Sequence, residues 1–121
     1  MNTNEPKPNR LYICVREDFP DYMAPTLVAH ATLRHHLLHT DLPHIYEQEY
    51  KDWVVNSFRK CVVRLNLKEF NKVRELEGII ESWENNTLNG EVSCVTYIHP
   101  PTTPLPNVLK FAKLWKPNIM D

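Results

Sequence analysis

The chain has 121 residues, of which 42% are hydrophobic, and its formal net charge is −1. This length provides one compact core and is too short for two ordinary domains, while the near-neutral charge argues against a large nucleic-acid footprint. No apolar run approaches the roughly 20 residues of a membrane-spanning helix, and residues 1–10 lack the apolar core of a signal peptide. We therefore expect a soluble, cytoplasmic protein with a flexible leader at residues 1–10 and a single domain at residues 11–121.

The first half of the chain predicts one strand and two helices. Residues 11–16 are a β-branched and aromatic run that predicts a buried strand, and the turn sequence DFPD follows it closely. Pro25 suits the first turn of a helix over about residues 24–39, because no amide hydrogen is needed there. Aromatic residues recur at helical spacing over residues 46–58, which predicts a second helix with its aromatic stripe on the core.

The second half predicts three strands and two helices. Asn66 and Glu69 form a capping-box pattern that opens a third helix, and this helix runs to about Glu77, before Gly78. Asn89-Gly90 is a tight-turn signal between the last two strands. The strands are expected at residues 60–65, 79–83 and 91–98, and the final helix at residues 107–115. This order of strands and helices predicts an α/β fold.

Four of the six histidines fall in the stretch MAPTLVAHATLRHHLLH of the first helix. His35 and His39 are one helical turn apart, and HHLLH imitates the zinc motif H-E-x-x-H. His36 replaces the glutamate that would activate water, and a third ligand would have to come from His44 or Glu47. We therefore expect no metal at this cluster, and we expect its histidines to be exposed or at the border of the core.

Other residues limit the chemistry further. Cys14, Cys61 and Cys94 each lie among apolar neighbours, which predicts buried free thiols. Two glycines in the whole chain exclude a glycine-rich phosphate loop, so no cofactor is expected. Basic residues gather in the second half, either as a phosphate-binding patch or as ordinary solvated helix faces, and they are Arg59, Lys60, Arg64, Lys68, Lys72, Arg74, Lys110, Lys113 and Lys116.

The strand end CVREDF followed by a helix with VAHA resembles the opening of the archaeal and eukaryotic-type peptidyl-tRNA hydrolases. That family has a strand ending V-R-x-D-L and a helix with A-A-Q-x-x-H-A, so Arg16, Asp18 and His30 match its pattern. FRKCVVRL resembles its G-Q-x-K-V-V-V-K strand, with Lys60 at the lysine position. The last strand, proline turn and closing segment also resemble the family, so the resemblance covers nearly the whole chain.

The resemblance implies a small mixed four-stranded sheet flanked by helices and an activity in translation, the hydrolysis of the ester in peptidyl-tRNA. The residues that it places at the catalytic site are His30, Asp18, Glu84 and Thr87. The substrate-binding candidates are Arg16 and Lys60, with Lys68 and Lys72 from the basic segment. We expect His30 to open onto a cleft shared with Asp18, Lys60 and residues 84–87, because catalysis needs a base within hydrogen-bond reach.

The sequence departs from the family where the chemistry should be. Met23 stands in place of the family's loop lysine, and Leu27 in place of its glutamine. The family's D-A-G-x-T is replaced by WENNT, in which Glu84 and Thr87 occupy the acidic and hydroxyl positions. An inactive scaffold of the same fold is therefore the alternative. It would bind a protein or RNA partner through the basic segment or through Tyr46, Tyr50 and Trp53, as a monomer or homodimer.

Overall fold

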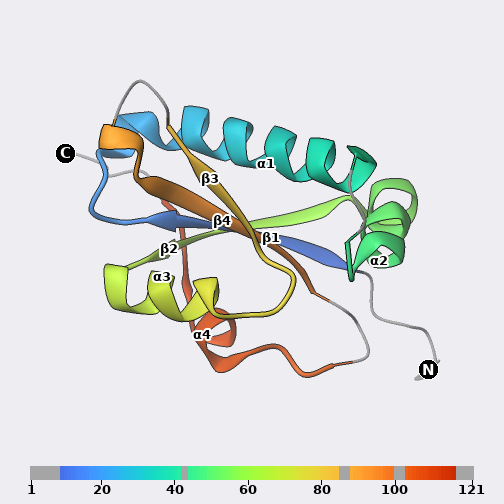
Figure 1. Cartoon of the computed structure of the whole chain (residues 1–121). Helices are drawn as coiled ribbons and strands as arrows, with labels where there is room; N and C mark the ends of the chain where they lie inside the picture. Colours follow the sequence, from blue (N-terminus) through green and yellow to red (C-terminus); the bar gives the residue numbers. More distant parts are fainter. Residues whose placement is uncertain (1–8, 42–43, 85–87, 100–102, 117–121) are drawn as a thin grey trace.

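Five strands form one mixed sheet in the order β3-β4-β1-β2-β5, as the computed structural model shows (Figure 1). The structure describes residues 9–41, 44–84, 88–99 and 103–116. β1 lies parallel to β2 and antiparallel to β4, and the two outer pairs are antiparallel. The strands are β1 Arg10–Arg16, β2 Arg59–Leu65, β3 Ile80–Trp83, β4 Val92–His99 and β5 Lys113–Leu114. The chain is thus a single α/β domain with a five-stranded mixed sheet.

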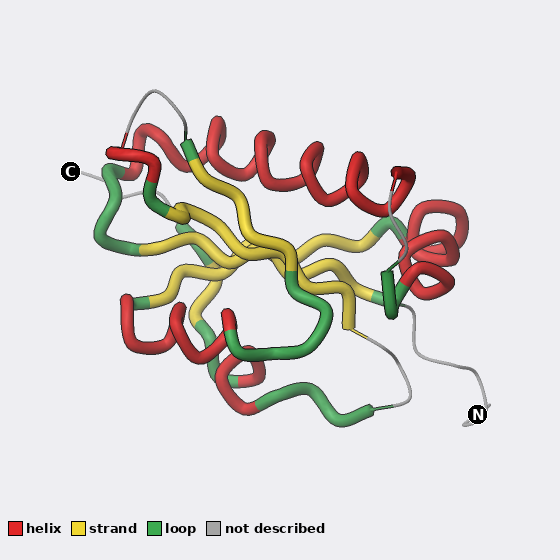
Figure 2. The backbone as a smooth tube through the Cα atoms, in the orientation of Figure 1, coloured by secondary structure: helices red, strands yellow, loops and turns green. Residues whose placement is uncertain are grey.

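Helices cover both faces of this sheet. α1 and α2 lie on one face, and α3 and α4 lie on the other (Figures 1 and 2). Their bounds are α1 Ala24–Asp41, α2 Glu47–Asp52, α3 Leu67–Arg74 and α4 Asn107–Lys110, with short helical turns η1 Asp21–Met23, η2 Trp53–Ser57 and η3 Leu88–Gly90. Within the described residues, no helix is long and apolar enough to cross a membrane.

The alternation of side chains along β1 divides the core into two halves. Leu11, Ile13 and Val15 pack against α1 and α2, whereas Tyr12 and Cys14 pack against α3 and α4. Because the central strand is buried on both faces, it is continuously apolar in sequence. This explains why the run at residues 11–16 was recognisable as a buried strand. The observed strand also takes in Arg10, and buried Asn9 precedes it, whereas the rest of the expected leader lies outside the described residues.

The predicted final helix is wrong beyond its first turn. α4 ends at Lys110, and the chain continues as β5, which pairs with β2 and is the strand that the four-stranded prediction missed. The Trp115 amide donates to the Val62 carbonyl at 2.9 Å. This pairing satisfies backbone groups of β2 that would otherwise form an open sheet edge. Tertiary pairing therefore overrides the helical spacing of the apolar residues in this segment.

The other boundaries differ by smaller amounts. The second predicted helix is α2 followed by the π-helical turn η2, and Phe58 ends it in a left-handed conformation with φ of 57°. α3 ends at Arg74, earlier than expected. Gly78 follows with φ of 88°, and a side chain there would collide with the ring of Tyr46. Glycine is required at that position because both the conformation and the space exclude a larger residue.

The capping box of α3 is confirmed and supports a prediction. The Glu69 amide donates to the Asn66 side chain at 2.8 Å, and the Asn66 amide donates to the Glu69 carboxylate at 3.2 Å. Asn66→Ala is expected to lower the free energy of unfolding by about 1 kcal/mol. Glu69→Gln keeps an acceptor and should cost much less. Urea denaturation measures both, and equal losses in the two variants would contradict this account of the cap.

Candidate functional site

His30 and Glu84 form a histidine–carboxylate pair at the surface. The His30 Nδ1 atom lies 3.0 Å from each carboxylate oxygen of Glu84. The His30 side chain is 53% exposed, whereas that of Glu84 is 10% exposed. A carboxylate accepts hydrogen bonds, so it selects the tautomer in which Nδ1 carries the proton. The Nε2 lone pair is then left to accept a proton from water or a substrate.

The topology brings these two residues together. His30 lies on α1, which contacts β3, and Glu84 directly follows that strand. Four buried or half-buried apolar residues, Ala24, Leu27, Val28 and Ala31, hold this part of α1 on the sheet, so its orientation is fixed. The expected proximity of His30 to the segment beginning at Glu84 is therefore observed, whereas Thr87 lies outside the described residues.

Arg34 and Trp83 adjoin the pair, and neither was a candidate from the sequence. Arg34 follows His30 by one helical turn, so the two side chains lie on the same side of α1. Its guanidinium carbon is 4.1 Å from the ring centroid of Trp83, the residue before Glu84. Its Nε is buried without a hydrogen-bond partner, and Arg34 makes no ion pair with any described residue. The i, i+4 spacing from His30 was the signal that could have identified it.

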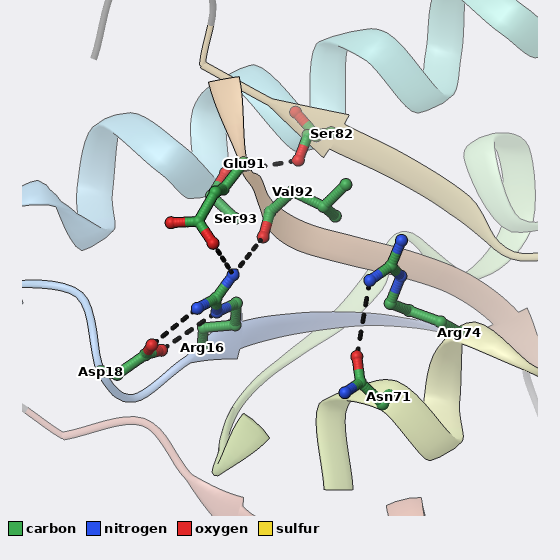
Figure 3. Close-up of polar contacts among 8 residues, drawn as sticks. All are labelled: Arg16, Asp18, Asn71, Arg74, Ser82, Glu91, Val92 and Ser93. Carbon is green, nitrogen blue, oxygen red and sulfur yellow. Dashed lines mark hydrogen bonds and ion pairs between the residues drawn. The ribbon is translucent and has the colours of Figure 1, made fainter. Parts of the chain in front are cut away.

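Arg16 and Asp18 are bound to each other (Figure 3). Arg16 donates to the Asp18 carboxylate from Nε at 3.0 Å and from Nη2 at 2.6 Å. Its Nη1 donates to the Val92 carbonyl at 3.3 Å and lies 3.5 Å from Glu91. The Arg16 hydrogen bonds lower the pKa of Asp18, and the buried guanidinium ties the end of β1 to the start of β4. Within the described residues, Asp18 makes no hydrogen bond or ion pair with His30.

The lysine candidates lie elsewhere. The Lys60 ammonium donates to the Phe58 carbonyl at 2.9 Å and lines a hollow that does not include His30. Lys68 and Lys72 are exposed on α3, which packs on the sheet face opposite α1 (Figure 1). The structure therefore brings His30 and Glu84 together, and it does not bring these lysines to the same surface.

Met23 and Leu27, which lie before and within the first turn of α1, are used for packing. Leu27 of α1 is buried in the core, and Met23 packs against the same cluster. Apolar side chains at these two positions cannot donate hydrogen bonds to a substrate. Arg34, one helical turn from His30, carries a positive charge at this surface.

The prediction that the remaining helix histidines are exposed or at the border is wrong for His35 and His39. Both are buried, because they continue the i, i+4 stripe that begins with Leu27 and Ala31. The His35 Nδ1 atom lies 2.6 Å from the Thr96 hydroxyl, and the rings of His35 and His39 stack at 4.6 Å. Burial lowers the pKa of His35 to about 3 and that of His39 to about 4.

The remaining candidates for metal binding and thiol chemistry are the histidine cluster and the cysteines. Among the described residues, no three histidine, cysteine, aspartate or glutamate side chains are placed to share a metal ion. All three cysteines are free, and Cys14 and Cys94 are buried as predicted, whereas Cys61 is half-buried. Burial raises the pKa of Cys94 to about 12, so its thiol stays protonated at neutral pH.

Comparison with protein families and with curated proteins finds no match for this chain. The arrangement of His30, Glu84 and Arg34 is therefore the observation on which a function rests.

Proposed function

We propose that the chain is a divergent peptidyl-tRNA hydrolase-like protein that acts on, or at least holds, the ester-linked acceptor end of peptidyl-tRNA. The observation that carries this proposal is the contact between the half-exposed imidazole of His30 and the nearly buried carboxylate of Glu84. An oriented imidazole with one free nitrogen is the group that ester hydrolysis requires of a general base.

In the proposed reaction, His30 acts first as a general base and then as a general acid. Nε2 accepts a proton from a water molecule as the water oxygen bonds to the ester carbonyl carbon. Glu84 stabilises the imidazolium that forms and holds the ring in one orientation. The imidazolium then returns its proton to the ribose oxygen as the ester bond breaks. The products are the free peptide acid and tRNA with its terminal hydroxyl restored.

Arg34 takes the place of the missing loop cation in this proposal. Met23 offers no charge, whereas the guanidinium of Arg34 lies over Trp83 without a carboxylate partner among the described residues. Guanidinium groups bind phosphate through paired hydrogen bonds, and they also stabilise a developing oxyanion. We therefore assign Arg34 to the substrate's negative charge, beside the proposed base.

This assignment predicts an effect on tRNA binding. Arg34→Gln should weaken binding and reduce the log-log salt slope by about one phosphate contact, or roughly 0.7 to 0.9. Lys72→Gln is the matched control, because it removes one exposed charge from the opposite sheet face. Fluorescence anisotropy with labelled tRNA over a salt series measures both. A larger loss of slope in Lys72→Gln would contradict the placement of tRNA on the α1 face.

The alternative is an inactive scaffold of the same fold. The apolar residues at positions 23 and 27 favour it, because they leave the loop without the family's polar groups. Tyr50 and Trp53 are buried, so most of this aromatic stripe packs in the core. A turnover assay on peptidyl-tRNA, with His30→Ala beside the wild type, decides between enzyme and scaffold. Turnover lost in His30→Ala supports the enzyme, and tRNA binding without turnover in the wild type supports the scaffold.

A further inference from the structure

We propose that a groove between α1 and η2 binds a small amphiphile, with its alkyl chain along the groove and an anionic headgroup at Lys60. The groove consists of two adjoining hollows of about 620 and 530 Å³, which share His36, Tyr50 and Val54 in their linings. Hollows of this size are typical of small-molecule sites. The groove lining does not include His30 or Glu84, so the proposal is independent of the hydrolase function.

The groove exists because the helices leave part of the sheet open. α1 contacts β1, β3 and β4, and the floor of the larger hollow lies at the next strand pair, where Ile13 of β1 faces Val62 of β2 in register. One wall is the apolar side of α1, with Val28, Ala29 and Leu33, and the other is formed by Trp53, Val54 and Phe58. The floor and both walls of the larger hollow are therefore mainly apolar.

The polar side chains in the walls of the larger hollow already have partners. The Thr32 hydroxyl donates to the Val28 carbonyl at 2.8 Å, and the His36 Nδ1 atom lies 3.0 Å from the Tyr50 hydroxyl. Trp53 donates its ring N–H to the Arg59 carbonyl at 2.6 Å. The walls consequently offer few free hydrogen-bonding groups, which favours an apolar ligand body over a polar one.

Apolar side chains at the rim are left in water. Leu33 is 58% exposed, Val55 is 79% exposed and Phe58 is 59% exposed. They come from both walls, so a chain lying between them would cover apolar surface on each side. Burial of that surface supplies the driving force for binding, and adjacent exposed apolar residues commonly mark a binding site.

The positive charge of Lys60 favours a ligand whose headgroup is negatively charged. Among the described residues, Lys60 is the one lysine, arginine or acidic residue that lines the larger hollow. Its ammonium lies 3.4 Å from the ring centroid of Phe58 and donates to the Phe58 carbonyl, and no carboxylate of the described residues pairs with it. An ammonium has three donors, so donors remain for an anion. At the other hollow, Lys51 is already paired with Glu47 at 3.2 Å.

Isothermal titration calorimetry with two amphiphiles of the same alkyl chain tests the proposal on the full chain. Dodecanoate, kept below its micelle concentration, should bind saturably, and dodecyltrimethylammonium should bind at least roughly tenfold more weakly because its charge repels that of Lys60. Shortening the carboxylate chain should weaken binding roughly fourfold for each buried methylene that is removed.

Three variants locate the ligand. Lys60→Met keeps an apolar stem and removes the charge, so dodecanoate should bind roughly tenfold more weakly. Lys110→Met is the matched control, because the Lys110 ammonium also lies over an aromatic ring, 5.6 Å from that of Phe111, but belongs to α4 on the opposite face. Leu33→Asp should abolish binding of either amphiphile, and thermal unfolding checks that this exposed substitution leaves the fold intact.

Several outcomes would overturn the proposal. They are an absence of saturable dodecanoate binding, equal affinity for the two headgroups, or an unchanged affinity in Lys60→Met. Sedimentation velocity tests a further outcome that would overturn the proposal. If the protein binds no dodecanoate but forms a concentration-dependent dimer, and Leu33→Asp abolishes that dimer, then a second copy of the chain covers the groove.

Discussion

Lowering the pH from 7 to 5 is expected to reduce the free energy of unfolding by about 4 kcal/mol, or about 2 kcal/mol for each of His35 and His39. Burial lowers the pKa of these groups to about 3 and about 4 in the folded chain, against 6.5 for an ordinary histidine. Below pH 6.5 the unfolded chain binds protons that the folded chain does not. Stability therefore falls as the pH drops from 6.5 towards the folded pKa values.

The packing around the two rings explains why the pKa values of His35 and His39 are lowered. His35 is fully buried with its Nδ1 atom against the Thr96 hydroxyl, and neither ring nitrogen of His39 has a hydrogen-bond partner among the described residues. His44 lies 4.1 Å from His39 between ring centroids, so a second positive charge there would add repulsion. The charge of Glu47 raises the pKa of His39, but burial is the larger cause and lowers it.

Urea denaturation at pH 7 and pH 5 measures this loss. His39→Phe keeps an aromatic ring in the stack and removes one titrating group, so the difference between the two pH values should fall by about half. Leu33→Phe places a ring at an exposed, non-titrating position of the same helix and is the control, which should keep the pH difference of the wild type. Equal stability of the wild type at both pH values would show that the histidines are not held neutral by burial.

The same histidines show what sequence periodicity can and cannot resolve. Leu27 and Ala31 belong to the buried stripe of α1, and its continuation through His35 and His39 follows from the same i, i+4 spacing. The sequence prediction has them exposed or at the border of the core. What allowed their burial is tertiary: the Thr96 hydroxyl of β4 and the ring of Tyr50 accommodate them. Neither contact could be read from residues 23–39 alone.

Local signals predicted local structure well and long-range pairing less well. The capping box of Asn66 and Glu69 and the buried strand β1 depend on neighbouring residues, and both are confirmed. β5 depends on the exposed edge of β2, far away in the sequence, so helical spacing at residues 107–115 was misleading. The contact of His30 with Glu84 joins segments that are distant in sequence, and only the order of motifs in the resemblance indicated it. The placement of Arg34 beside this pair depends on its contact with Trp83, which is also distant in sequence.

Glu84→Gln is expected to lower kcat/KM for peptidyl-tRNA by about 100-fold or more, if His30 acts as the general base. Glutamine is close to glutamate in shape, but it cannot balance the charge of the imidazolium that forms during proton transfer. Its amide can also donate to Nδ1, which would favour the tautomer whose Nε2 carries the proton and cannot accept one. Binding of tRNA should change little, because Glu84 is nearly buried and lies behind the imidazole.

Glu81→Gln is the matched control for this substitution. Glu81 belongs to β3, just before Glu84, and its carboxylate pairs with Arg74 at 2.6 Å and not with His30. It should keep the turnover of the wild type. Single-turnover kinetics measures each variant, and anisotropy with tRNA separates binding from chemistry.

The double variant identifies the partner of Glu84. If Glu84 acts only by orienting and stabilising His30, then His30→Ala should remove turnover by itself, and adding Glu84→Gln should remove no more. Additive losses would mean that Glu84 contacts the reacting groups independently of the imidazole. Turnover that survives His30→Ala would rule out His30 as the base. Among the described residues, His30 is the side chain that is hydrogen-bonded to Glu84.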